Sequence, residues 1–154
     1  MQAVTGAINH HVRCKLSAPG ARRMGRIRVL LADDHETLLA RVRSILCPDF
    51  EVVGTVANGR DAVTEVRRLD PDVLVIDISM PVLDGLQAAS QLGRKACRTK
   101  VVFLTVHEDQ DYVDAAFAAG ASGYVTKSHV ASDLVPAIRE ALIGNTYISK
   151  SIKL

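Results

Sequence analysis

The sequence predicts an α/β fold in which a five-stranded parallel sheet carries helices on both faces. From Ile27 to Asn145, apolar runs rich in β-branched residues alternate with segments whose apolar residues recur at helical spacing. The run Val73–Ile76 does not alternate with polar residues, which is typical of a strand buried on both faces of a parallel sheet. Because crossovers are right-handed, few topologies remain, and the strand order 2-1-3-4-5 is favoured.

Length and charge limit the class of protein. A chain of 154 residues with 48% apolar and 23% charged residues is typical of one soluble globular domain. No apolar run approaches the roughly 18–20 residues that cross a membrane. Residues 29–154 hold 13 basic and 17 acidic side chains, a net charge of −4, because the other six basic side chains lie in residues 1–28. This acidic balance is not the basic footprint of a nucleic-acid-binding domain.

Three regions are expected along the chain. Residues 1–25 show no periodicity and lack the apolar stretch of a signal peptide, so we expect a disordered extension. Residues 26–144 carry the regular pattern and form the domain. Residues 145–154 follow the last helical stop signal and are expected to begin a linker.

The first half of the domain is expected to contain two strands and two helices. The runs at 27–32 and 50–56 are rich in β-branched and aliphatic residues, as strands are. Between them, residues 36–47 place their apolar side chains on one helical face. Asn58-Gly59 is a turn signal, the next helical stripe extends to Leu69, and Asp70-Pro71 ends that helix.

The second half continues the alternation. The buried strand at 73–76 is followed by a short helix at 84–92, a strand at 101–105 and an alanine-rich helix at 110–119 that Gly120 ends. A fifth strand at 122–126 and a fifth helix ending at Gly144-Asn145 complete the pattern.

Polar side chains stand where these strands end: Asp33 and Asp34, Asp77, Thr105 and Lys127. Because the carboxyl ends of parallel strands meet at one edge of the sheet, we expect them to converge beside the switch point, where α/β sheets bind ligands. Three carboxylates in one cleft repel one another unless a hard cation lies among them, and Mg²⁺ suits carboxylate oxygens and water. A threonine hydroxyl and a lysine ammonium then suit the oxygens of a phosphoryl group.

Residues 27–144 resemble the receiver domain of two-component response regulators, a flavodoxin-like fold. The residues that carry the resemblance are the Asp33-Asp34 pair, the stretch DISMPVLDG that begins at Asp77, Thr105, and the GYVTK segment that ends at Lys127. The resemblance implies a signalling switch and not an enzyme, although a receiver assists its own phosphotransfer and autodephosphorylation.

The resemblance also implies a role for each residue. Asp77 would accept a phosphoryl group from a phosphohistidine of a sensor histidine kinase. Asp34 and Asp77 would bind Mg²⁺ directly, Asp33 through water, and Ser79 through its backbone carbonyl. Lys127 would pair with Asp77 and then with the phosphoryl group.

Two further residues would form the switch. Thr105 would move to hydrogen-bond the phosphoryl group, and Tyr124 would turn inward when the threonine moves. The alanine-rich helix at 110–119 has few large apolar anchors, so we expect it to shift easily. His35 and His107 lie near the site, and we expect surface or capping roles for both, although His107 is placed to affect water access.

The segments AAGASGYVTKS and GNTYIS most resemble receivers of the LuxR/NarL/FixJ type, which precede a helix-turn-helix DNA-binding domain. The resemblance implies a cytoplasmic protein, a phosphorylation-favoured homodimer and no membrane contact. It also implies contact with DNA only through a C-terminal effector domain beyond this chain. A stand-alone receiver that relays or sinks phosphoryl groups is the alternative. A small-molecule phosphatase is disfavoured, because Ser79 stands where its second acid would be.

Overall fold

The computed structural model describes residues 26–94 and 97–152, so the extension expected at 1–25 lies outside the described residues. Strands and helices alternate in it with bounds close to those expected. In chain order they are β1 (Ile27–Ala32), α2 (Glu36–Leu46), β2 (Phe50–Val56), α3 (Gly59–Leu69), β3 (Val73–Ile76), α4 (Gly85–Arg94), β4 (Lys100–Thr105), α5 (Gln110–Ala118), β5 (Gly123–Thr126), the 3₁₀ turn η1 (Lys127–His129), α6 (Val130–Leu142) and β6 (Tyr147–Ile148).

The sheet has the order β2-β1-β3-β4-β5-β6, and every neighbouring pair is parallel. The predicted order 2-1-3-4-5 is therefore confirmed for the first five strands. The change of direction between β1 and β3 brings the ends of these two strands together, which places the expected switch point at Asp33 and Asp77.

The expectation of only five strands, with a linker from residue 145, is wrong for residues 147–148. These residues pair with β5 in the register Gly123↔Tyr147 and Tyr124↔Ile148. Ser149 and Ile152 beyond them are buried. A strand of two residues after a helix stop signal has no periodic pattern of its own, so only its pairing with β5 reveals it.

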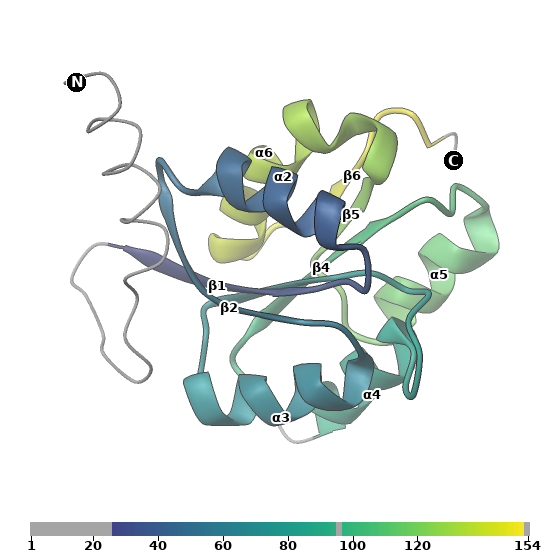
Figure 1. Ribbon diagram of the computed structural model, residues 1–154. Coiled ribbons are helices and arrows are strands. Elements are labelled where there is room, and N and C mark those ends of the chain that lie inside the picture. The colour runs from purple at the N-terminus through teal and green to yellow at the C-terminus, as the bar shows by residue number, and fades with distance from the viewer. Residues whose placement is uncertain (1–25, 95–96, 153–154) are drawn as a thin grey trace, which may run out of the picture.

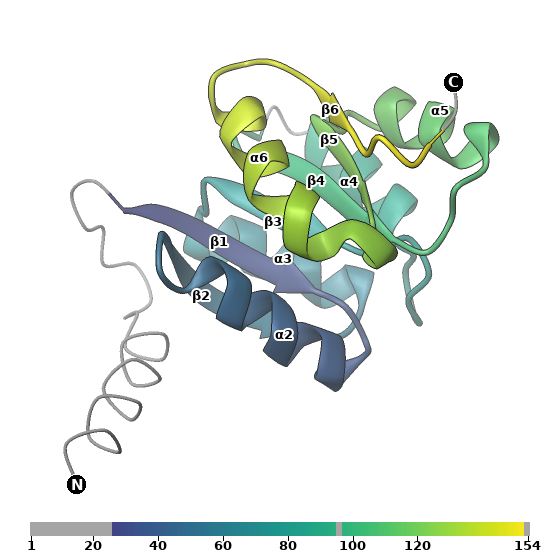
Figure 2. The same cartoon turned by 90° about the horizontal axis from the view of Figure 1, so that it is seen from above.

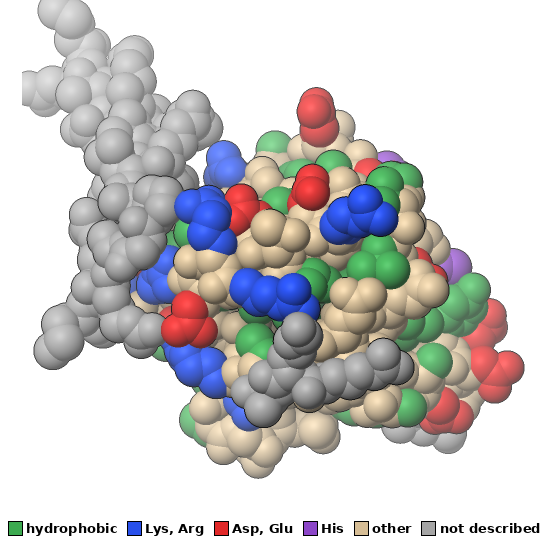
Figure 3. Space-filling view, turned by 90° about the horizontal axis from the view of Figure 1, so that it is seen from below, with side chains coloured by type: hydrophobic (Ala, Val, Ile, Leu, Met, Phe, Trp, Pro, Cys, Tyr) green, Lys and Arg blue, Asp and Glu red, His purple; other side chains and the backbone are tan. Residues whose placement is uncertain are grey.

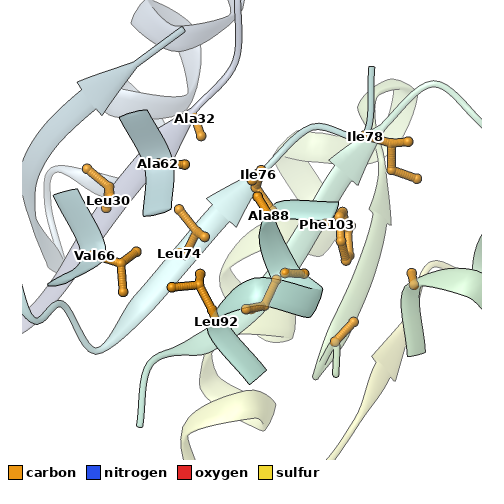
Figure 4. Close-up of a cluster of buried hydrophobic side chains, with 14 of the residues drawn as sticks. Leu30, Ala32, Ala62, Val66, Leu74, Ile76, Ile78, Ala88, Leu92 and Phe103 are labelled. Carbon is orange, nitrogen blue, oxygen red and sulfur yellow. The ribbon is translucent and has the colours of Figure 1, made fainter. Parts of the chain in front are cut away.

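Two layers of helices enclose the sheet (Figure 1). Helices α2 and α6 cover one face, where Val42, Leu46 and Leu134 pack on the sheet. Helices α3, α4 and α5 contribute to the other face, where Ala62, Val66, Ala88 and Leu92 meet strand residues such as Leu30, Leu74, Ile76 and Phe103 (Figure 4). The strand β3 lies between both layers, which explains its unbroken apolar run.

One face of the molecule carries charged side chains of both signs (Figure 3). On the face that carries α3 and α4, basic and acidic side chains are interspersed among polar and apolar ones (Figure 3). Arg68 and Glu65 of α3 form one of the ion pairs there. Among the described residues, no helix is both long enough and apolar enough to span a membrane.

Candidate functional site

The carboxyl edge of the sheet gathers the acidic residues that the sequence singled out. Asp33 follows β1 and Asp77 follows β3, and both side chains are buried. Asp34 and His35 are exposed at the mouth of the site. One carboxylate oxygen from each aspartate and one ring nitrogen of His35 all lie within 4.8 Å of one another. The predicted convergence of Asp33, Asp34 and Asp77 is thus present in the structure.

Lys127 lies between two of these carboxylates. Its Nζ donates a hydrogen bond of 2.9 Å to Asp77 Oδ2 and is also 2.9 Å from Asp33 Oδ2. Burial lowers the pKa of Lys127, but hydrogen bonding and Coulombic attraction from Asp33 and Asp77 outweigh it, so the net pKa is raised. The lysine is therefore a cation that partly balances the acidic cluster.

The backbone fixes the orientation of Asp77. Its Oδ1 accepts a 2.7 Å hydrogen bond from the backbone N–H of Ile78, while Oδ2 faces Lys127. Gly85 at the start of α4 packs against the Asp77 carbonyl so closely that a Cβ at this position would overlap it. The start of α4 and the end of β3 can therefore pack this closely only because residue 85 is a glycine.

The donor set fits a hard divalent cation. Asp33 Oδ2 is buried and lies 2.9 Å from the Lys127 ammonium. The Asp34 carboxylate adds an exposed oxygen on the open side. A cation that binds oxygen and keeps several waters, such as Mg²⁺, is the kind of ion that these groups suit.

The two predicted switch residues meet at His107, in the loop after β4. The Thr105 Oγ1 accepts a 3.3 Å hydrogen bond from the His107 backbone N–H, and the Tyr124 hydroxyl donates one of 2.8 Å to the His107 carbonyl. The Tyr124 side chain is fully buried. Burial raises the pKa of Tyr124, with smaller contributions from nearby acidic groups.

The His107 side chain connects the acidic site to helix α5. Its Nε2 is 2.8 Å from the Ser79 Oγ in the loop after Asp77, and its ring stacks on Tyr112 with centroids 4.0 Å apart. His107 is thus a connecting residue and not a plain surface group, which the sequence alone did not reveal. The only signal was its position two residues after Thr105.

His35 is exposed, as expected for a surface residue, but it does not fill the capping role that was the other expectation. It precedes α2, but its side chain makes no capping hydrogen bond. Its Nδ1 instead lies 2.8 Å from Asp33 Oδ1 and 3.2 Å from Asp34 Oδ1. The imidazole therefore contacts both carboxylates of the acidic pair. The sequence signal for this contact was the position of His35 directly after the pair.

The chain matches the response regulator receiver domain family over residues 29–139. This chain belongs to that family. It is 38% identical over 128 residues to an uncharacterized transcriptional regulatory protein, YvfU, of Bacillus subtilis (strain 168), which covers 82% of this chain and 64% of that protein. It is equally 38% identical over 128 residues to the response regulator UvrY of Escherichia coli (strain K12), with coverage of 82% and 59%.

Solved structures of response regulators also superpose on this chain. A LuxR-family two-component response regulator from Aurantimonas sp. SI85-9A1 superposes with a TM-score of 0.78 at 32% identity, covering 82% of this chain and 92% of that chain. The isolated receiver domain of RcsB from Salmonella enterica serovar Typhimurium gives 0.75 at 25% identity, covering 82% and 96%. The predicted family, its LuxR-type relatives and the flavodoxin-like fold are confirmed. The receiver spans about three fifths of the length of the curated relatives named above.

Proposed function

We propose that Asp77 of this receiver accepts a phosphoryl group from a phosphohistidine of a sensor histidine kinase and so switches a transcriptional output. The observation that carries the proposal is the placement of Asp77 beside Lys127, within a cluster of carboxylates that suits Mg²⁺. Relatives that are named as transcriptional regulators support the proposal that the output is transcriptional. A stand-alone receiver that passes or sinks phosphoryl groups is the alternative.

The chemistry follows from these side chains. The Asp77 carboxylate forms a new O–P bond while the P–N bond to the donor imidazole breaks, and the imidazole takes up a proton. Mg²⁺, when bound, supplies positive charge to the phosphoryl oxygens. Asp34 and Asp77 would hold it directly, Asp33 through water, and Ser79 through its carbonyl. Lys127 holds Asp77 in line and then neutralises charge on the transferred group.

The signal would pass through Thr105 and Tyr124. A phosphoryl group adds about −1.5 to −2 charge and three acceptor oxygens beside Thr105. The Thr105 hydroxyl accepts a hydrogen bond from the His107 N–H, and the Tyr124 hydroxyl donates one to the His107 carbonyl. Turning the Thr105 hydroxyl toward the phosphoryl oxygens would break the first of these bonds, at the same residue that Tyr124 contacts. Helix α5 would respond through Tyr112 on the His107 ring. We further propose a cytoplasmic protein that forms a homodimer when phosphorylated.

The test is phosphorylation by acetyl phosphate with Mg²⁺, followed by intact-mass measurement. The wild type is expected to gain the mass of one phosphoryl group, and Asp77→Asn is expected to gain none. Asp84→Asn is the matched control, because Asp84 lies in the same loop but caps α4 through the Gln87 N–H and touches none of the other carboxylates described. A phosphorylated Asp77→Asn protein would refute the assignment.

A further inference from the structure

The C-terminal residues 147–152 are bound to β5 on both sides of Tyr124. The Tyr147 N–H donates to the Ser122 carbonyl at 3.1 Å, and the Ser149 N–H donates to the Tyr124 carbonyl at 2.8 Å. Ile152 belongs to the same apolar cluster as Tyr124 and Val113 of α5. Figure 2 shows this yellow segment returning from α6 to β5 and ending beside α5. We call residues 147–152 the C-terminal strap.

A buried carboxylate holds the strap. Asp133 in the first turn of α6 is 7% exposed, and its Oδ2 accepts a 2.7 Å hydrogen bond from the Ser149 hydroxyl. Its Oδ1 accepts a second bond from the Ser132 hydroxyl on α6. Burial, and to a smaller degree the neighbouring Asp133 carboxylate, raises the pKa of the Tyr147 hydroxyl. A carboxylate at this depth needs such donors, because an unpaired one is costly to bury.

The same serine holds the residue that precedes Lys127. The Ser149 Oγ accepts a 3.1 Å hydrogen bond from the Thr126 N–H. The Thr126 hydroxyl in turn lies 3.1 Å from Ser151 Oγ of the strap and 3.2 Å from His129 Nδ1 of η1. The strap is therefore hydrogen-bonded to Thr126, the residue directly before the turn, and the Thr126 hydroxyl in turn contacts His129, the last residue of the turn.

We propose that Ser149, held by Asp133, is a positioning residue for Lys127, so that a docked strap and a correctly placed lysine support each other. The inference rests on the proposed phosphorylation of Asp77. Its physical basis is that the Ser149 hydroxyl donates to Asp133 and accepts from Thr126, one residue before the lysine that touches Asp77. Because coupling between two sites is reciprocal, a ligand that engages Lys127 also stabilises the docked strap.

The first test compares rate and metal affinity in Ser149→Ala. The rate of phosphorylation by acetyl phosphate is expected to fall severalfold, because a displaced Lys127 no longer positions Asp77. The Mg²⁺ affinity is expected to be unchanged or tighter, because Asp33, Asp34 and Asp77 remain. Ser149→Thr restores a hydroxyl and is expected to recover the rate. Ser132→Ala is the control, since it removes the other hydroxyl donor to Asp133 without touching the strap. Because the Ser132 hydroxyl also lies 3.3 Å from the His129 carbonyl of η1, its loss is expected to slow phosphorylation less than Ser149→Ala does.

If Ser149→Ala lost both phosphorylation rate and Mg²⁺ affinity, the substitution would have disturbed the whole site, and the proposal would be overturned. An equal loss of rate in Ser132→Ala would also overturn it. An unchanged rate in Ser149→Ala would also overturn it.

The second test uses hydrogen exchange of the wild type with Mg²⁺ and beryllofluoride. Amide exchange in residues 147–152 is expected to slow at least about fivefold when the probe binds. Protection of the Ile78 amide beside Asp77, without any change in the strap, would overturn this inference and leave the proposed function standing. Protection at neither place would overturn both.

Discussion

Lys127 lies 50 residues after Asp77 in the sequence, yet its ammonium group donates a hydrogen bond of 2.9 Å to the Asp77 carboxylate. It is equally close to Asp33. One lysine thus faces two of the three clustered acids, where a divalent cation would also act. This shared position leads to the first prediction.

Replacing Lys127 with methionine is expected to strengthen Mg²⁺ binding and slow phosphorylation. The ammonium repels a divalent ion held by Asp33 and Asp77, so its loss should raise Mg²⁺ affinity by about tenfold, measured by calorimetric titration. Lys100→Met, at the opposite end of β4, is the control and is expected to bind Mg²⁺ as the wild type does. Weaker Mg²⁺ binding in Lys127→Met would show that the lysine organises the acids more than it competes with the ion.

Gly85→Ala is expected to damage the site from outside it. A Cβ at Gly85 would overlap the Asp77 carbonyl, so the backbone that carries the acceptor must shift. We expect a loss of about 2 kcal/mol in the free energy of unfolding, measured in urea, together with slower phosphorylation. Gly93→Ala in the same helix is the control. Its Cβ meets only the Ala119 carbonyl at 3.8 Å, so it is expected to be neutral or stabilising. Equal effects at both glycines would contradict this reasoning.

The contact between Ser79 and His107 is expected to govern the lifetime of the phosphoryl group. Their side chains meet at 2.8 Å between the loop after Asp77 and the loop after Thr105. Ser79→Ala and His107→Ala are each expected to open the site to water and speed loss of the phosphoryl group severalfold. The double variant should add little, with a coupling energy of at least about 0.5 kcal/mol. Fully additive rates in such a double-mutant cycle would mean that the contact has no role.

Tyr124 gives a prediction for alkaline pH. Its pKa is raised in the folded protein, so the folded state holds the proton while an unfolded tyrosine loses it near pH ~10. The stabilisation is fully present below that pH and is lost as pH rises above it. Urea unfolding from pH ~8 to ~11 should therefore show a steeper loss of stability for the wild type than for Tyr124→Phe. Parallel pH curves for the two proteins would refute the explanation.

At neutral pH, Tyr124→Phe is itself expected to be less stable by about 1 kcal/mol, because the His107 carbonyl loses its hydroxyl partner. This offset does not depend on pH below the ordinary tyrosine range. The slope of stability with pH, and not its absolute value, is the quantity that tests the raised pKa.

Local pattern was sufficient to predict much of the molecule. The unbroken apolar run before Asp77 identified a strand buried on both faces, and β3 is that strand. Polar residues at the ends of successive strands had to share one edge, because parallel strands place their carboxyl ends together. Asp33, Asp34, Asp77 and Lys127 meet there for this reason.

Other features depended on tertiary contacts. Strand β6 forms because residues 147–148 pair with the free edge of β5, and because the buried Ser149 donates a hydrogen bond to Asp133. His107 contacts Ser79 because the loops after β3 and β4 are neighbours. By itself the sequence determined the order of the first five strands with their helices and the carboxylates of the acidic site, since both follow from residue spacing. Only the tertiary structure decided which polar groups hold the switch residues and the C-terminal strap, because those hydrogen bonds join segments with no shared pattern.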